Sequence, residues 1–265
     1  MDAAIVKMRT SDDAFLGGAL NILQPQEGYR AGLDAVLLAA AAPVEVGRGQ
    51  HILDVGAGTG VVGLAVARRV ADAAVTLVER DSELAALARA NAARNGLSGR
   101  VRVVEADVTR PLRDLAGIGA RAETFDHVLA NPPFHTEGRG TAAGDALKAA
   151  GHAMPDGNLD RWVRFMAAMA RPGGTATLIH RAEAIGDILQ ALAGRFGGIL
   201  VLPLHPREGE PASRVIVQGT KGSRAPLRLL PGLVLHNPDQ GFRPEVEAVL
   251  RHGAGLDLGR GAPTS

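Results

Sequence analysis

The feature that most constrains the fold of this chain is an apolar strand that runs directly into a glycine-rich turn. Residues 51–55 read His-Ile-Leu-Asp-Val, and the next five residues read Gly-Ala-Gly-Thr-Gly. Glycines at such positions let the backbone turn sharply and approach a ligand where a Cβ atom would clash. We therefore predict a buried strand, a following helix over 61–70, and between them a loop that contacts a nucleotide-like cofactor. The predicted contacts come from Gly56, Ala57, Gly58 and Gly60.

Downstream of this loop, apolar runs and helical periodicities alternate along the chain. Strands are predicted over 75–79, 101–106, 125–130, 175–180, 199–202 and 214–218, and helices over 81–95, 158–170 and 182–196. This alternation predicts an α/β fold with a doubly wound, mostly parallel, seven-stranded Rossmann-like sheet. The loop between the last two strands is too short for a crossover helix, so these strands should form a C-terminal antiparallel hairpin. The tail beyond Arg251 is rich in glycine and is expected to be loose.

The composition excludes several classes of protein. The chain has 265 residues, 46% of them hydrophobic, which is enough for a large core. It has no cysteine, so disulfides and thiolate zinc sites are excluded, and no metal site is expected. The apolar stretch 35–43 is shorter than the roughly 20 residues that cross a bilayer. We expect a soluble cytoplasmic protein with no membrane partner. Its net charge of +1 gives, by itself, no electrostatic footprint for nucleic acid.

Acidic residues stand at the ends of three predicted strands. Glu79 lies about 20 residues after the glycine loop, where a carboxylate can accept hydrogen bonds from both hydroxyls of a ribose. Asp107 follows the third strand, where it can accept from an adenine amine, and Arg80 is added to this predicted site. Asp54 lies just before the first glycine, where it would oppose a diphosphate but tolerate a sulfonium. The pattern favours S-adenosylmethionine over a nicotinamide cofactor, and over a glycine turn used only for packing.

A second motif, Asn131-Pro132-Pro133-Phe134, comes directly after the strand over 125–130. The Asn131 carboxamide and the Pro132 carbonyl can accept the two N–H groups of an exocyclic amine, which aims its lone pair at an electrophilic carbon. Consecutive prolines hold these acceptors rigidly, and Phe134 can stack on a base, worth about 1–3 kcal/mol. Because no cysteine is available to activate a ring carbon, the target should be intrinsically nucleophilic, such as an amine. The alternative is a turn that proline merely stiffens.

These motifs resemble those of class I S-adenosylmethionine methyltransferases of the amine-modifying Asn-Pro-Pro-Tyr/Phe group. Segment 24–38 is similar to the N-terminal segment of the bacterial tRNA(Val) adenine-N6 methyltransferase family, and segment 205–222 is similar to its C-terminal hairpin. The resemblance implies that Asp34 and its neighbours close over the cofactor, that Glu79 holds the ribose, and that Asp107 holds the adenine. It also implies that the turn at 131–134 binds the target, an adenine N6 amine in a tRNA anticodon loop, with RNA as the partner.

The resemblance further implies a single methyltransferase domain over 1–265, made of an N-terminal segment and lid (1–50), a cofactor-binding core (51–220) and a C-terminal extension (221–265). The pair Phe134-His135 departs from the tyrosine without histidine of many family members, and Asn-Pro-Pro-Phe-His also occurs in rRNA guanine-amine methyltransferases. The alternatives are therefore guanine N2 in rRNA, a protein glutamine, a small molecule, or a non-catalytic cofactor-binding module. The oligomeric state is left open.

Two further groups of residues need an interpretation. Trp162 and Phe165, three residues apart on a predicted helix, should pack in the core rather than form a cage for a base. Five basic residues are candidates for phosphate contacts, although an ordinary solvated surface explains them equally well. They are Arg207, Arg214, Lys221, Arg224 and Arg228.

Overall fold

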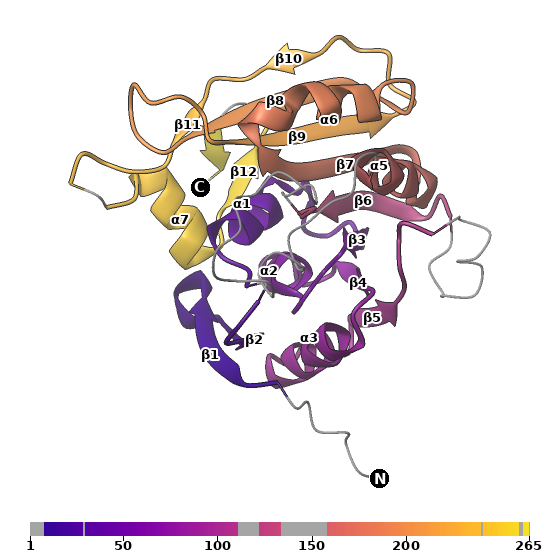
Figure 1. Cartoon of the computed structure of the whole chain (residues 1–265), viewed down its shortest axis with the longest axis vertical. Coiled ribbons are helices and arrows are strands. Elements are labelled where there is room, and N and C mark those ends of the chain that lie inside the picture. Colours follow the sequence, from indigo (N-terminus) through magenta and orange to yellow (C-terminus); the bar gives the residue numbers. More distant parts are fainter. Residues whose placement is uncertain are drawn as a thin grey trace, which may run out of the picture.

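The computed structural model describes residues 8–28, 30–110, 122–133, 158–239, 241–259 and 262–264. Its centre is a nine-stranded sheet in the order β10-β8-β9-β7-β6-β3-β4-β5, with β11 also paired to β8 (Figure 1). The strands of this sheet are β3 (His51–Val55), β4 (Ala74–Glu79), β5 (Val101–Glu105), β6 (Phe125–Ala130), β7 (Ala170–Arg181), β8 (Phe196–His205), β9 (Arg214–Lys221), β10 (Arg228–Leu229) and β11 (Leu233–Val234). The described helices are α1 (Leu33–Ala41), α2 (Val61–Arg69), α3 (Ser82–Arg94), α5 (Asn158–Met169), α6 (Ile185–Leu192) and α7 (Pro244–His252).

The pairing of the strands confirms the predicted α/β fold. The strands β5, β4, β3, β6 and β7 are parallel to one another. The strand β9 lies between β7 and β8 and is antiparallel to both, which is the predicted hairpin. The two-residue strands β10 and β11 extend the sheet beyond the seven predicted strands by pairing with β8.

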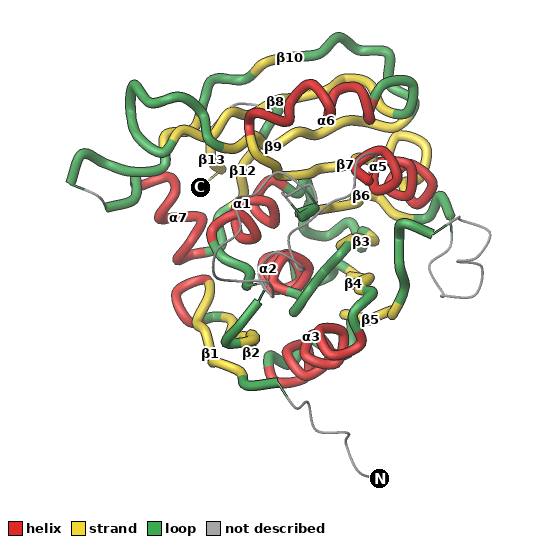
Figure 2. The backbone as a smooth tube through the Cα atoms, viewed as in Figure 1, coloured by secondary structure: helices red, strands yellow, loops and turns green. Residues whose placement is uncertain are grey.

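Alternation of apolar residues along the strands gives the sheet two buried faces. Ile52 and Leu129 belong to the core cluster that includes residues of α1, α2 and α7. Their chain neighbours Leu53 and Val128 belong to the second cluster, which includes residues of α5 and α6. Because successive side chains of a strand point to opposite faces, helices cover the sheet on both sides (Figures 1 and 2). Trp162 and Phe165 lie in the second cluster, as predicted.

The N-terminal segment contains a hairpin that the sequence pattern did not predict. The strands β1 (Thr10–Phe15) and β2 (Leu20–Pro25) pair antiparallel and form a separate sheet beside α3 (Figure 1). The short 3-10 helix η1 (Leu16–Gly18) joins them. A Cβ atom on Gly17 would lie 2.6 Å from the Arg251 carbonyl oxygen, so this connection packs directly on the backbone at the end of α7.

The C-terminal tail is more ordered than predicted. The strand β12 (Gly255–Asp257) pairs with β13 (Ala262–Thr264). Leu256 and Leu258 are buried against the cluster that contains α1, and this burial holds a tail that its glycine content alone would leave loose. None of the helices in the described ranges is long and apolar enough to cross a bilayer.

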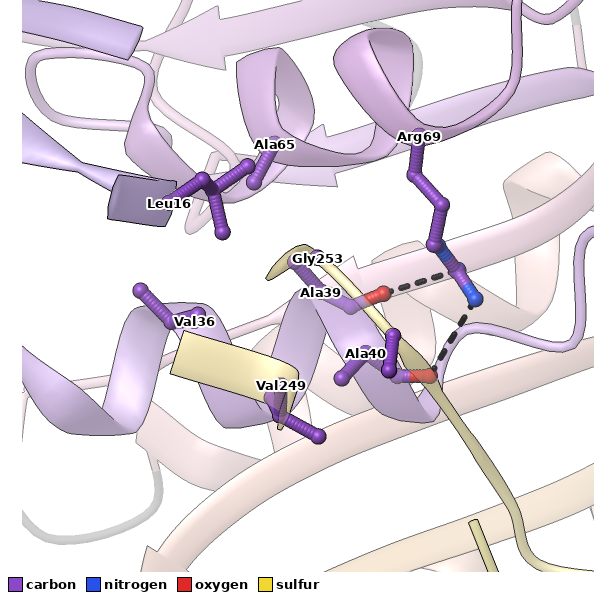
Figure 3. Close-up of a pocket in the computed structure, with 9 residues that line it drawn as sticks. Leu16, Val36, Ala39, Ala40, Ala65, Arg69, Val249 and Gly253 are labelled. Carbon is purple, nitrogen blue, oxygen red and sulfur yellow. Dashed lines mark hydrogen bonds between the residues drawn. The ribbon is translucent and has the colours of Figure 1, made fainter. Parts of the chain in front are cut away.

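The half-buried side chain of Arg69 contacts the C-terminal end of α1. The α1 helix has no basic residue in its own last turn. Arg69, at the end of α2, donates to the carbonyl oxygens of Ala39 at 2.9 Å and Ala40 at 3.4 Å (Figure 3). It also donates to the Ala42 carbonyl oxygen at 2.8 Å. These are carbonyls that a helix end leaves without an intrahelical partner. A small hollow lined by α1, α2, η1 and α7 lies beside this contact (Figure 3).

Candidate cofactor and substrate site

The parallel register brings the predicted site residues to one edge of the sheet. Val55, the last residue of β3, pairs with Val78 of β4 and with Ala130 of β6. Gly56 follows Val55, and Asn131 follows Ala130, so the glycine loop and the proline turn leave neighbouring strands at the same level. Adjacent strands lie about 4.8 Å apart. The carboxyl edge of the sheet therefore places the two motifs side by side.

The glycine loop has backbone geometry that requires glycine. The φ angles of Gly56, Gly58 and Gly60 are 66°, 57° and 91°, all in the left-handed region. A Cβ atom on Gly56 would also lie 2.2 Å from Cη2 of Trp162, so the loop lies directly against the α5 side chain. The Ala57 N–H donates to the Val78 carbonyl at 2.9 Å, which ties the loop to β4. The loop is therefore held closely on both sides.

Glu79 stands at the end of β4 and holds backbone amides. Its Oε2 accepts from the Gly58 N–H at 2.8 Å, and its Oε1 accepts from the Arg80 and Asp81 N–H groups at 2.8 and 2.9 Å. The side chain is buried, with 8% of the residue exposed. The carboxylate that was predicted to meet a ribose thus also fixes the loop that would lie beside that ribose.

Asp54 is the second buried carboxylate beside the loop. It accepts from the Gly63 N–H of α2 at 3.0 Å, and only 1% of the residue is exposed. Burial raises the pKa of Asp54 to about 7, opposed by the Gly63 hydrogen bond and reinforced by the negative charge of Glu79. Within the described ranges, neither carboxylate forms a salt bridge. The two carboxylates beside the loop favour a cation and disfavour a phosphate.

Asp107 lies two residues beyond β5 and is partly exposed. Its Oδ1 accepts from the Thr109 N–H at 3.0 Å and from the Thr109 hydroxyl at 2.7 Å. Burial raises the pKa of Asp107, but the Thr109 hydrogen bonds and the charges of Arg80 and Arg110 outweigh it, so the pKa lies below its usual value. Asp107 is therefore an ionised acceptor. Arg80 is exposed, and its charge acts on Asp107.

Asp34 lies in the first turn of α1. It forms an ion pair with Arg214, the first residue of β9, at 3.0 Å. The described contacts thus connect Asp34 to the C-terminal hairpin, and none of them joins it to the glycine loop. Its predicted closure over the cofactor stays a prediction.

The proline turn is described as far as Pro133. Pro132 is buried, while Asn131 and Pro133 are half-buried. The stacking residue Phe134, and His135 after it, lie outside the described residues. The position of Asn131 follows from the register of β6, which the apolar run before it specified.

The five basic residues proposed for phosphate contact do not form one series. The strand β9 runs antiparallel to β7, so Arg214 pairs with Arg181 at the carboxyl edge. Lys221, at the other end of β9, bonds to Glu123 and to the Ala170 carbonyl, each at 2.8 Å. Seven residues of strand separate Arg214 from Lys221 by roughly 23 Å. Arg214 and Lys221 therefore lie at opposite ends of the strands of the sheet.

Sequence reasoning missed Asn91 of α3, which contacts the glycine loop, and Asn95, the residue just after this helix. Asn91 is completely buried, and its Nδ2 donates to the Thr59 carbonyl of the glycine loop at 3.0 Å. Asn91 and Asn95 also bond to the backbone of β2. The available signal was a pair of asparagines four residues apart on an otherwise alanine-rich helix, a spacing that places them on one face.

The residues of the loop fit S-adenosylmethionine. The carboxylates of Asp54 and Glu79, which have no salt-bridge partner among the described residues, suit a ligand that carries a sulfonium and an ammonium. The left-handed φ angles of Gly56, Gly58 and Gly60 give the loop the sharp turn predicted for a cofactor-binding connection between strand and helix. The Thr59 hydroxyl is buried and has no hydrogen-bond partner among the described residues, which leaves one polar group of the loop available to a ligand.

Comparison with known proteins identifies relatives of this chain. A family model described as "Methyltransferase small domain" matches residues 33–161. A tRNA1(Val) (adenine(37)-N6)-methyltransferase of Shewanella putrefaciens is 27% identical over 190 residues, which are 71% of this chain and 76% of the relative. Ribosomal RNA small subunit methyltransferase C of Pseudomonas entomophila is 35% identical over 142 residues, 51% of this chain and 39% of the relative.

A solved structure gives the most extensive overlap among these comparisons. It is described as a predicted O-methyltransferase from Agrobacterium tumefaciens. It is 34% identical with a TM-score of 0.71, covering 84% of this chain and 98% of that one. The resemblance to the bacterial tRNA(Val) adenine-N6 methyltransferases that the motifs predicted is confirmed, and so is S-adenosylmethionine as the cofactor of the family. The chain therefore belongs to the S-adenosylmethionine-dependent methyltransferases that share the methyltransferase small domain.

Proposed function

We propose that this protein transfers a methyl group to the exocyclic N6 amine of an adenine in RNA, most specifically in a tRNA anticodon loop. The observation that carries the proposal is the level register of Gly56 and Asn131 on adjacent strands. It sets a rigid pair of acceptors next to the loop that suits a sulfonium cofactor. The relatives that modify tRNA or rRNA supply the class of substrate.

The chain's own residues would divide the work between holding the cofactor and holding the amine. The Glu79 carboxylate accepts three backbone hydrogen bonds and would use its remaining lone pair to accept one from a ribose hydroxyl. Asp107 would accept a hydrogen bond from the adenine amine of the cofactor. The glycine loop would lie along the cofactor, with Asp54 favouring positive charge. Asp34 would help the N-terminal segment to close over the cofactor. S-adenosylmethionine, when bound, supplies an electrophilic methyl group on a sulfonium.

The proline turn would orient the target. The Asn131 carboxamide oxygen would accept one N–H of the adenine amine, and the Pro132 carbonyl oxygen would accept the other. Burial of Pro132 and the fixed φ of both prolines hold these acceptors in place, so orientation is set before the substrate arrives. Phe134 would stack on the flipped base. Neither asparagine nor proline is a base, so the proton of the alkylated amine leaves to water.

The RNA backbone would meet the carboxyl edge of β7 and β9. Arg181 and Arg214 lie directly opposite each other there, in the last register pair of the two strands. Like charges facing each other across strands destabilise a sheet, and here each arginine has a carboxylate beside it, Asp34 for Arg214 at 3.0 Å and Glu183 for Arg181 at 3.2 Å. Both arginines stand on the edge at which β6 delivers Asn131. We assign this pair to phosphate contacts and leave Lys221, on the opposite edge, outside the RNA surface.

A second candidate is methylation of guanine N2 in rRNA. It is favoured by the 35% identity to the Pseudomonas entomophila rRNA methyltransferase over 142 residues. An exocyclic amine of either purine satisfies the same two acceptors, so the turn alone does not separate them.

The decisive experiment uses RNA from a strain that lacks the gene. Total RNA is incubated with the purified protein and labelled S-adenosylmethionine, and the nucleosides are resolved by mass spectrometry. N6-methyladenosine in the tRNA fraction supports the proposal, and N2-methylguanosine in rRNA supports the second candidate. Ribose-methylated nucleosides, or labelled small molecules without labelled RNA, would overturn both.

The RNA surface has its own matched pair of variants. Arg214→Gln should reduce the slope of log affinity against log salt by about one for the RNA substrate. Lys221→Gln removes the same charge from the opposite edge and should leave the slope unchanged. Equal slopes in both variants and the wild type would remove Arg214 from the RNA contact.

A further inference from the structure

The helix α3 presents two asparagine side chains to the outer edge of β2. Asn95 accepts from the Asn21 N–H at 3.0 Å and donates to the Asn21 carbonyl at 2.9 Å. Asn91 accepts from the Leu23 N–H at 2.8 Å and donates to the Leu23 carbonyl at 3.0 Å. Each carboxamide thus exchanges a pair of hydrogen bonds with one residue of the strand, as a residue of a neighbouring strand would.

The spacing of Asn91 and Asn95 along the helix axis matches the spacing of Asn21 and Leu23 along the strand, so both pairs of hydrogen bonds can form at once. Four residues of α-helix rise by about 6.0 Å. Two residues of strand, from Asn21 to Leu23, rise by about 6.7 Å. Since β1 covers the other edge of β2, the asparagines satisfy backbone groups that an edge strand would otherwise leave open. Arg94 lies between Asn91 and Asn95 in the sequence. Its guanidinium donates to both carboxylate oxygens of Asp12, at 2.6 and 3.0 Å, and so links β1 to the same helix.

The two asparagines differ in their third hydrogen bond. The remaining donor of Asn95 goes to the Asn91 carbonyl, within its own helix, at 2.8 Å. The remaining donor of Asn91 goes to the Thr59 carbonyl of the glycine loop at 3.0 Å. Thr59 lies between Gly58, which Glu79 holds from the other side, and Gly60, where α2 is about to begin. One fully buried carboxamide therefore bonds to the N-terminal hairpin and to the cofactor loop at once.

We propose that Asn91 is a positioning residue that couples docking of the β1–β2 hairpin to the conformation of the cofactor loop. With both of its amide hydrogens committed, Asn91 cannot keep the Thr59 carbonyl in place unless β2 is seated on α3. The hairpin thus sets cofactor affinity although it does not belong to the loop. The inference rests on the proposed placement of the cofactor at this loop, and it does not depend on which RNA is methylated.

Coupling of this kind is reciprocal. If a docked hairpin favours cofactor binding, bound cofactor must favour the docked hairpin by the same factor. In the wild-type protein, S-adenosylhomocysteine should therefore slow hydrogen exchange of the β2 amides that point to α3, of which Leu23 is the most informative. An unchanged exchange rate for Leu23 in the saturated protein would overturn the coupling, with no variant required.

The variants Asn91→Leu and Asn95→Leu separate loop positioning from hairpin docking. Both replacements are close in size to asparagine, and each removes one pair of bonds to β2, Asn91→Leu the pair with Leu23 and Asn95→Leu the pair with Asn21. Only Asn91→Leu also removes the bond to Thr59. We expect Asn91→Leu to weaken binding of S-adenosylhomocysteine at least tenfold in calorimetric titration, and Asn95→Leu to change it less than threefold, while both lower the thermal midpoint.

The outcomes are distinct from those that test the proposed function. Equal affinity losses in the two variants would mean that hairpin docking alone matters, and they would overturn the role of Asn91, as would unchanged affinity in Asn91→Leu. A wild-type protein that does not bind S-adenosylhomocysteine would end the cofactor assignment and this inference together. Absence of RNA methylation, with the binding pattern as expected, would leave the inference standing and dismiss only the substrate.

Discussion

The Gly58 N–H donates to the Glu79 carboxylate at 2.8 Å, which joins the glycine loop to the end of β4 inside the protein. A carboxylate that is proposed to hold a ribose therefore also shapes the loop. Glu79→Ala should weaken binding of S-adenosylhomocysteine by at least tenfold and destabilise the free protein by about 1–3 kcal/mol, because the buried Gly58 N–H and the part-buried N–H groups of Arg80 and Asp81 lose their acceptor. Calorimetric titration and urea unfolding measure the two effects. Unchanged affinity would remove Glu79 from the cofactor site.

Asn131→Ala should separate catalysis from cofactor binding. Loss of one preorganised acceptor should lower kcat by about 10²–10³-fold. The affinity for S-adenosylhomocysteine should stay within a few-fold, because Asn131 belongs to β6 and its turn rather than to the glycine loop. Single-turnover methylation and titration give the two numbers. A collapse of cofactor affinity would show that the division of labour between the two motifs is wrong.

Asp54 should make recognition of the sulfonium depend on pH. Burial raises its pKa to about 7, so the side chain is neutral below that pH and negative above it. Affinity for S-adenosylmethionine relative to S-adenosylhomocysteine, which lacks the sulfonium charge, should therefore rise from pH 6 to pH 8, by up to about tenfold per pH unit. Asp54→Asn should flatten this ratio. A wild-type ratio that stays constant over the range would place Asp54 out of reach of the charge.

His127 should make folding stability fall in mild acid. It is buried in β6 between Gln50 and Thr175, with 2.9 Å contacts to both, and burial lowers its pKa from 6.5 to about 4. Between pH 6.5 and pH 4 the unfolded chain therefore binds a proton at His127 that the folded protein does not bind. The contribution of neutral His127 to the free energy of unfolding is present above pH 6.5 and is lost as the pH falls towards 4. The loss approaches about 3 kcal/mol. Urea unfolding at pH 7.5 and pH 4.5 measures it, and His127→Gln should remove that component of the pH dependence.

Arg69 should contribute more to stability than its neighbour Arg68. Arg69→Met keeps the packing of the stem but removes bonds to three carbonyls at the end of α1, and we expect a loss of about 2–3 kcal/mol. Arg68 makes an exposed bond to the Asn95 carbonyl at 2.9 Å, so Arg68→Met should cost less than about 1 kcal/mol. Thermal unfolding of the two variants compares them. Equal effects would mean that the carbonyls of α1 find other donors when Arg69 is removed.

The elements that the sequence located well are those with one strong local signal. The strand β6 was predicted at its observed bounds because an apolar run ends abruptly at Asn131 and two prolines. The helix α3 was predicted from a capping residue and a stop, and Asp81 does accept from the Glu83 and Leu84 N–H groups at 2.9 and 3.0 Å. Such signals lie within a few residues of the element that they specify.

The elements that were missed depend on partners far away in the chain. The strand β1 reads Thr-Ser-Asp-Asp-Ala-Phe, which has no apolar alternation, and β2 is held by side chains of α3 some 70 residues later. The strand β7 begins earlier than predicted, at Ala170, because an irregularity in its register with β6 lets Phe125 pair there before regular pairing starts at His127. Local propensity carries no information about either contact.

The candidate site divides in the same way. Strand-end positions such as Glu79 and Asp107 could be predicted because parallel strands end at one edge. The ion pair of Asp34 with Arg214 could not, because 180 residues separate them. The separation of Arg214 from Lys221 required the direction of β9 between its neighbours, which a list of basic residues does not contain.

The Trp162 ring leaves no room for a side chain at position 56, so substitutions at these two distant positions are expected to depend on each other during evolution. Any lineage that replaces Gly56 must first, or simultaneously, acquire a smaller residue on α5. Directed evolution of this loop that varies positions 56–60 while leaving 162 fixed will recover glycine at 56 for steric reasons. Libraries intended to admit a bulkier cofactor analogue should therefore diversify both positions together.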